Sequence, residues 1–182
     1  MSPGASAWAA AAGALFFVAA WLAIPLTTPE GVSQFWPAAG IAVGFLIISG
    51  RTARWPVAAG IAIASFLANA LVGRSGPACY AFALGNTGEA LLVAALVEHW
   101  FPRPFELDRF GNVLGLFGAA ALGTVASQAI MVVMLELSGH TAAPFVVLWS
   151  RLVWATMTGI VMIAPILLGL ADQRANRCLS GR

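Results

Sequence analysis

The sequence predicts an all-α fold, a polytopic transmembrane helical bundle of about six helices. Two observations support this prediction. Of the 182 residues, 60% are hydrophobic and only 9% are charged, whereas a soluble domain of this size carries about 25% charged residues. The apolar residues also gather in stretches that approach the roughly 20 residues needed to cross a bilayer, with short turns between them. We therefore expect one integral membrane domain over residues 1–182.

The predicted helices follow one another closely. The start of the chain lacks a positively charged region, so the first stretch is interpreted as a retained helix and not as a secretory signal. The second stretch is short and holds Pro37 near its start, so a short or tilted span is expected and a re-entrant hairpin is the alternative. Pro165 is expected to kink the last helix. The predicted ranges are 8–26, 35–49, 55–72, 78–97, 112–135 and 145–170, with a cytoplasmic tail over 171–182.

The arginines predict the orientation. The chain has no Lys, and seven of its nine Arg follow the second, fourth and sixth stretches: Arg51, Arg54, Arg103, Arg109, Arg174, Arg177 and Arg182. Only Arg74 and Arg151 lie toward the other face. The positive-inside rule therefore places both termini in the cytoplasm of a bacterial inner membrane. Cys79 and Cys178 would then lie on opposite faces, so we expect no disulfide between them.

Small residues and helix ends suggest the packing. Glycine or alanine recurs every fourth residue at Gly40 and Gly44, at Gly60, Ala64 and Ala68, and at Gly111 and Gly115. Such spacings favour close helix contacts in lipid, because no hydrophobic force draws helices together there. Glu98 and His99 end the fourth stretch, where we expect a solvated surface.

Glu89 is the most informative polar residue, because it lies past the middle of the fourth stretch. A carboxylate at that depth costs several kcal/mol unless it is protonated or partnered. Asn86 lies three residues earlier and so on the same helix face. Two interpretations remain open: a hydrogen-bonded clamp between helices, or part of a ligand, proton or ion site.

Arg151 is the cationic candidate. It could extend outward to the membrane surface, pair with Glu136, or reach inward toward Glu89. An Arg that faces a polar cavity suits a carboxylate or phosphate group, so an anionic small-molecule ligand is one hypothesis. The further candidates for the polar core are Trp36, Asn69 and Gln128, together with Thr124, Ser127, Thr156 and Thr158.

Several classes of function lack support. The only histidines, His99 and His140, lie at helix ends, and no metal-ligand spacing, phosphate loop or nucleophile elbow occurs. We therefore expect no enzyme activity, no metal and no cofactor. The net charge of +2 comes without a basic stripe, so nucleic-acid binding is not expected.

Three motifs in order resemble the first class of membrane-associated sensor (MASE) domains. They are WPAAGIA at 36–42, GNTGEA at 85–90, and the aromatic entry 149–154 with the Gly and Pro of 159–165; the basic turn 51–55 followed by 65–69 also matches. The resemblance covers about 35–170. It implies a sensory region of the kind that precedes histidine kinase or cyclic-di-GMP-turnover domains, and that is similar to the membrane part of a sugar-phosphate-sensing kinase.

The chain departs from the family pattern in two ways. Thr156 stands where the family often has an Asp, and the usual region is longer and carries an output domain. We therefore expect a stand-alone sensor, an accessory subunit or a truncated sensor region, without enzymatic output of its own.

The sequence leaves three functions open. The favoured one is a sensory module in the lipid bilayer that receives a small-molecule or membrane-partner signal and passes it to a separate kinase or cyclase. The alternative is a substrate-binding subunit of a transporter of the energy-coupling-factor type, which the six short helices would also suit. The third is a structural membrane scaffold with no ligand.

Overall fold

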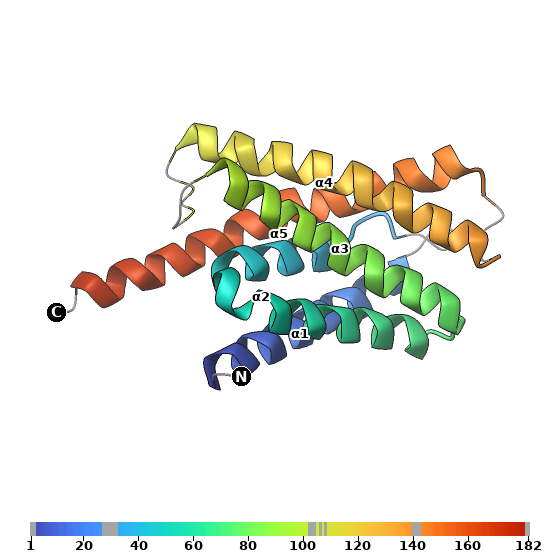
Figure 1. Ribbon diagram of the computed structural model, residues 1–182, viewed down its shortest axis with the longest axis horizontal. Coiled ribbons are helices and arrows are strands. Elements are labelled where there is room, and N and C mark those ends of the chain that lie inside the picture. Colours follow the sequence, from blue (N-terminus) through green and yellow to red (C-terminus); the bar gives the residue numbers. More distant parts are fainter. Residues whose placement is uncertain are drawn as a thin grey trace.

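The computed structural model of the protein describes residues 3–26, 33–101, 105, 107, 109–139 and 143–180, with side chains described up to residue 173 (Figure 1). The elements are α1 (Pro3–Ala23), a 3₁₀ turn η1 (Ile24–Leu26), α2 (Pro37–Leu71), α3 (Gly76–Trp100), α4 (Phe110–Leu137) and α5 (Phe145–Ser180). All five α-helices are long and apolar enough to cross a membrane. The predicted all-α membrane bundle is therefore confirmed.

Helix α2 contains two of the predicted stretches. At Gly50 the backbone has φ 67° and ψ −169°, a conformation that is almost confined to glycine. The chain reverses there, and Figure 1 shows the two arms of α2 running back past each other. Trp36, just before α2, and Asn69, near its end, line the same cavity because of this reversal. In a straight helix of this length the two ends would lie about 50 Å apart. The stretches 35–49 and 55–72 are thus the two arms of a hairpin.

Four of the helices form a closed ring. Helix α2 packs against α3, α3 against α4, α4 against α5, and α5 against α2. Helix α1 lies outside this ring and, among the described α-helices, packs only against α2. Side chains on the inner faces of α2, α3, α4 and α5 therefore point toward a common centre. Long, exposed apolar side chains cover the outside, as a helical surface in lipid requires.

The small residues mark close helix contacts at several of the predicted positions. A Cβ on Gly40 would lie 2.3 Å from the carbonyl oxygen of Gly159, so α2 and α5 touch backbone to backbone. A Cβ on Gly60 would lie 2.5 Å from the carbonyl oxygen of Ala9 on α1. Gly111, by contrast, faces open space. The spacing thus identified real contacts in α2 and at Gly115, where a Cβ would meet the Phe101 ring that follows α3, but not at Gly111.

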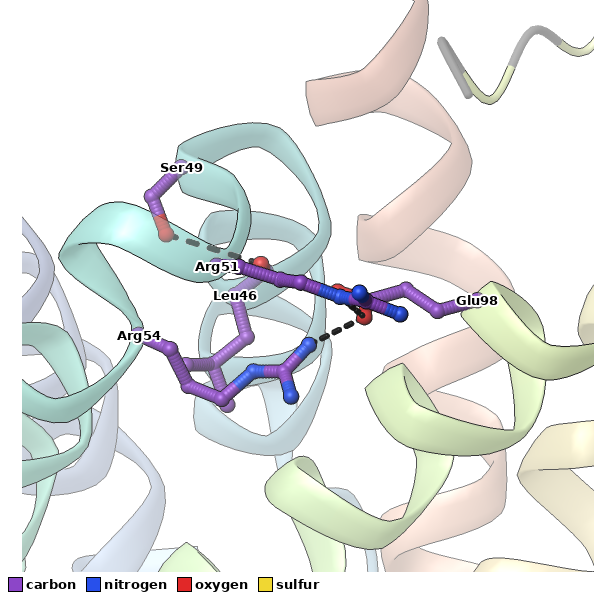
Figure 2. A network of polar contacts seen from close by, with 5 residues as sticks. All are labelled: Leu46, Ser49, Arg51, Arg54 and Glu98. Atoms are coloured by element: carbon purple, nitrogen blue, oxygen red, sulfur yellow. Dashed lines mark hydrogen bonds and ion pairs between the residues drawn. The ribbon is translucent and has the colours of Figure 1, made fainter. Parts of the chain in front are cut away.

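An ion-pair cluster closes the end of the ring where α2 reverses (Figure 2). Arg54 pairs with Glu98 near the end of α3, and the Nε of Arg51 lies 3.4 Å from the same carboxylate oxygen. The Glu98 side chain is only 7% exposed, so the prediction of a solvated Glu98 is wrong. The prediction failed because the neighbouring arm of α2 covers this end of α3. The contact brings the turn of α2 to the end of α3, the two places where the sequence gathers arginines.

Some predictions fall outside what the structure describes. Arg103, His140 and Arg182 lie outside the described residues, and the side chains of Arg174, Arg177 and Cys178 are not described. Cys79 is buried and free.

Candidate functional site

Glu89 lies inside the ring and joins three helices. Its residue is 1% exposed. From α4, the Thr124 hydroxyl donates to Oε1 at 2.7 Å and the Gln128 amide donates to Oε2 at 2.9 Å. The Thr156 hydroxyl on α5 also lies within hydrogen-bonding reach of the carboxylate, and it donates to the carbonyl of Leu152, 2.8 Å away one turn back on its own helix. Glu89 is therefore satisfied by neutral donors, and no ion pair of Glu89 occurs among the described residues.

A second group of buried polar side chains joins α2 to α3. The Asn86 amide donates to the Ser65 hydroxyl at 2.9 Å. The Asn69 amide donates to the Ser65 carbonyl at 2.8 Å, one turn back along its own helix. Ser65, Asn69 and Asn86 are all buried. Buried polar groups in a membrane bundle have to find partners inside the protein, and these three bond to one another.

A cavity opens beside both groups. Its empty volume is about 420 Å³, including open space at its mouth. The described residues that line it are Ile24, Ser33, Trp36, Asn69, Arg74, Phe82, Asn86, Met131, Leu152, Ala155 and Thr156. Every helix of the ring thus contributes to its wall. The cavity has room for a few water molecules or a small ligand group.

The turn between α2 and α3 places Arg74 on this wall. Gly73 has φ +79°, and its N–H donates to the carbonyl of Ala70 at 3.0 Å, while the N–H of Arg74 donates to the carbonyl of Asn69 at 3.2 Å. These two bonds form a Schellman motif, which ends α2 at a fixed geometry. The Ser75 hydroxyl then accepts from Ala78 and caps α3. The guanidinium carbon of Arg74 lies 4.5 Å from the centre of the Phe82 ring.

Trp36 connects the cavity directly to α5. Its backbone N–H donates to the carbonyl of Ala155 at 3.0 Å. A Cβ on Gly159 would lie 2.0 Å from the Trp36 carbonyl oxygen, so only glycine allows this approach. The indole Nε1 of Trp36 is buried and has no hydrogen-bond partner among the described residues, and the same holds for the Oε1 of Gln128. A donor and an acceptor are therefore available at the edge of the polar centre.

The structure brings together five of the six predicted site residues. Trp36, Asn69 and Asn86 line the cavity, and Glu89 and Gln128 bond to each other next to it. Arg151 is not among the residues that line the cavity, and the hydrogen bonds to Glu89 come from Thr124, Gln128 and Thr156.

Sequence reasoning missed Arg74 and Ser65 as members of the site. The signal that could have found Arg74 is the glycine before it: a Gly that ends a helix fixes the direction in which the next residue leaves. For Ser65, no signal stood out, because single serines are frequent in membrane helices as hydrogen-bond partners of their own backbone.

The comparisons with known proteins identify the family. Neither the curated proteins nor the solved structures contain a match to this chain. The model of the family MASE1 matches residues 8–180, nearly the whole chain. A polytopic helical bundle with its polar residues turned inward accords with that match. The chain therefore belongs to MASE1, a family of membrane sensory domains.

Proposed function

We propose that this protein is a sensory module in which the cavity and the adjoining Glu89 cluster receive a signal and α5 passes it to a separate output protein. The proposal places the module in a bacterial inner membrane with both termini in the cytoplasm, as the distribution of arginines favours.

The observation that carries the proposal is the position of α5. Leu152, Ala155 and Thr156 of this helix form one side of the cavity, and α5 continues to Ser180, where Figure 1 draws it extending past the other helices. One continuous helix, which contains Pro165, thus connects the polar centre with the region beyond the bundle. A ligand that altered the contacts of Thr156 or Trp36 would act on that helix directly.

The polar centre has the property that a switch requires. A ligand can shift an equilibrium between two packings only if it binds one of them better. Glu89 is shared by donors on α4 and α5, and Thr156 can donate either to Glu89 or to its own helix. A bound group or a displaced water that changed this choice would change how α5 packs against α3 and α4.

The test is the activity of the partner. The tagged chain is purified from its native membranes in mild detergent, and the co-purifying proteins are identified by mass spectrometry. The partner's phosphotransfer or cyclic-dinucleotide turnover is then measured with wild-type protein and with Glu89→Gln. We expect Glu89→Gln to change that activity at least several-fold while the amount of protein in the membrane stays the same.

The matched control is Glu136→Gln, which removes the same charge from an exposed position on α4. It should leave the partner's activity unchanged. Co-purification of ATPase subunits with a transmembrane coupling subunit would overturn sensing in favour of transport. An identical partner activity with wild-type and Glu89→Gln protein would favour the scaffold.

A further inference from the structure

We propose that the cavity binds a small neutral ligand that both donates and accepts hydrogen bonds, such as an amide, with Trp36 as the donor to it and Asn69 as the acceptor from it. This inference rests on the proposed function and names the chemical class of the signal. It departs from the anionic ligand considered from the sequence, because the two groups that hold the ligand are uncharged.

Trp36 supplies the donor. Its side chain belongs to the cavity wall, and its indole Nε1 is buried without a hydrogen-bond partner among the described residues. A buried donor without a partner costs free energy, and the hydrocarbon around the bundle offers no acceptor. A ligand oxygen that accepts from this N–H would remove that cost.

Asn69 supplies the acceptor. Its Nδ2 donates to the Ser65 carbonyl at 2.8 Å. A carbonyl can only accept, so this bond fixes which end of the Asn69 amide is turned toward Ser65. The Oδ1 at the other end accepts no hydrogen bond from the residues that the structure describes. Asn69 is buried and lies on the cavity wall, so its Oδ1 is ready to accept from a ligand.

This pair of groups selects for a ligand that carries both functions. A carboxylate accepts only, so it would leave the oxygen of Asn69 without a donor and place two oxygens near each other. An ammonium group donates only, so it would leave the Trp36 N–H unpaired. An amide or hydroxyl group does both and carries no charge into the bundle, where an ion is costly to bury. Arg74 also lies on the wall, with its guanidinium against the Phe82 ring, and neither of the two contacts involves it.

The rest of the wall limits the size of the ligand. The empty volume of about 420 Å³ includes open space at the mouth, which puts the cavity near the lower end of ligand pockets, about 300–1,000 Å³. Part of the wall is apolar: Ile24, Phe82, Met131, Leu152 and Ala155. A polar group with a short apolar part therefore matches it.

The same two residues connect the ligand to the bundle. The Trp36 backbone N–H donates to the Ala155 carbonyl of α5 at 3.0 Å, and its carbonyl lies against Gly159. Asn69 lies on the second arm of the α2 hairpin, whereas Trp36 precedes the first arm. A ligand bonded to both would hold the two ends of the hairpin together beside α5. Binding would thus favour the packing of α5 that fits this bridged arrangement.

The test measures binding to the whole chain in phosphatidylcholine nanodiscs by titration calorimetry, with empty nanodiscs as the blank. Three probes share one shape and differ in their hydrogen bonding. Propanamide donates and accepts, butan-2-one only accepts, and propanoate is an anion that only accepts. We expect saturable binding of propanamide, about 5-fold or more tighter than that of either other probe, the effect of one further hydrogen bond.

Two variants separate the donor from the acceptor. Trp36→Phe keeps an aromatic ring and removes the N–H, so it should weaken propanamide and butan-2-one alike, about 5- to 10-fold. Asn69→Leu removes the acceptor, so it should weaken propanamide by a similar factor and leave butan-2-one unchanged. Trp154→Phe is the matched control, because Trp154 on α5 is 70% exposed; it should bind all probes like wild type.

Trp36→Phe keeps the proposal testable if Asn69→Leu does not fold, because the Trp36 side chain makes no hydrogen bond within the described part of the chain. Equal binding of the three probes, tighter binding of propanoate, an unchanged affinity for propanamide in Trp36→Phe, or no saturable binding of propanamide would overturn the inference. The partner assay with Glu89→Gln is separate. A sensor of ions would pass that assay and fail this one, whereas a scaffold with a fortuitous amide site would do the reverse.

Discussion

Two glutamates on α3, both with shielded side chains, have opposite kinds of partner. Glu89, in the middle of the ring, accepts hydrogen bonds from neutral side chains on α4 and α5. Glu98, near the end of α3, pairs with Arg54 and Arg51 at the turn of α2. Both carboxylates are shielded from solvent, and each ties α3 to other parts of the chain. The difference between them lies in whether a positive charge is present.

The comparison distinguishes an ion pair that holds two helix ends together from a hydrogen-bonded centre whose contacts can change. An ion pair at the end of a bundle fixes one arrangement, because moving either partner leaves a shielded charge alone. Breaking a hydrogen bond to a neutral donor leaves no charge unpaired, and the Thr156 hydroxyl lies within reach of two acceptors, Glu89 and the Leu152 carbonyl. We infer that the Glu98 end holds the α2 hairpin in place, while the Glu89 centre is the part that responds.

The largest expected effect comes from Glu98→Gln. This substitution leaves Arg54, whose side chain is 21% exposed, beside a neutral amide. Removing one partner of a fully buried pair costs about 3–5 kcal/mol, so at this partly exposed end we expect about 2 kcal/mol. Unfolding in nanodiscs, followed by circular dichroism, measures the loss. The double variant with Arg54→Gln should recover part of the stability. Equal stability of Glu98→Gln and wild type would mean that the ion pair does not stabilise the fold.

An intermediate effect is expected for Thr124→Val. The substitution keeps the shape and removes the donor to Glu89. Hydrogen bonds between membrane helices contribute about 0.6 kcal/mol on average and up to about 1.7, so we expect a loss near 1 kcal/mol. The same unfolding measurement applies. The control is Thr158→Val, because Thr158 is exposed and, within the part of the chain that the structure describes, bonds to carbonyls of its own helix alone. Equal losses of stability in both variants would mean that the hydrogen bond from Thr124 to Glu89 does not stabilise the fold.

The smallest effect is expected for Arg51→Gln. Its side chain is 77% exposed and lies 3.4 Å from Glu98, so water and salt screen the attraction. Exposed pairs contribute about 0.2–1 kcal/mol, and we expect the lower end of that range. Unfolding at low and high salt should show this small loss only at low salt. A loss as large as that of Glu98→Gln would mean that Arg51, and not Arg54, holds this end.

Much of the fold was predictable because the bilayer constrains it. The low share of charged residues and the lengths of the apolar stretches required helices. A carboxylate in the middle of such a stretch required partners, so Glu89 with Asn86 could be selected from the sequence alone. Gly40 and Gly60 were recognisable as contact points because lipid-embedded helices need small residues where their backbones meet.

The tertiary structure decided which side chains meet. The donors of Glu89 depend on how far α4 and α5 are rotated about their axes, and no local pattern fixes that rotation. The choice of Arg74 over Arg151 for the cavity wall depends on the Gly73 turn at the end of α2. Glu98 is covered because the chain reverses at Gly50 and returns across the end of α3. The sequence by itself determined that the protein is a membrane bundle with a buried polar residue at its centre. Only the packing of distant helices determined the partners of that residue and the position of the cavity beside it.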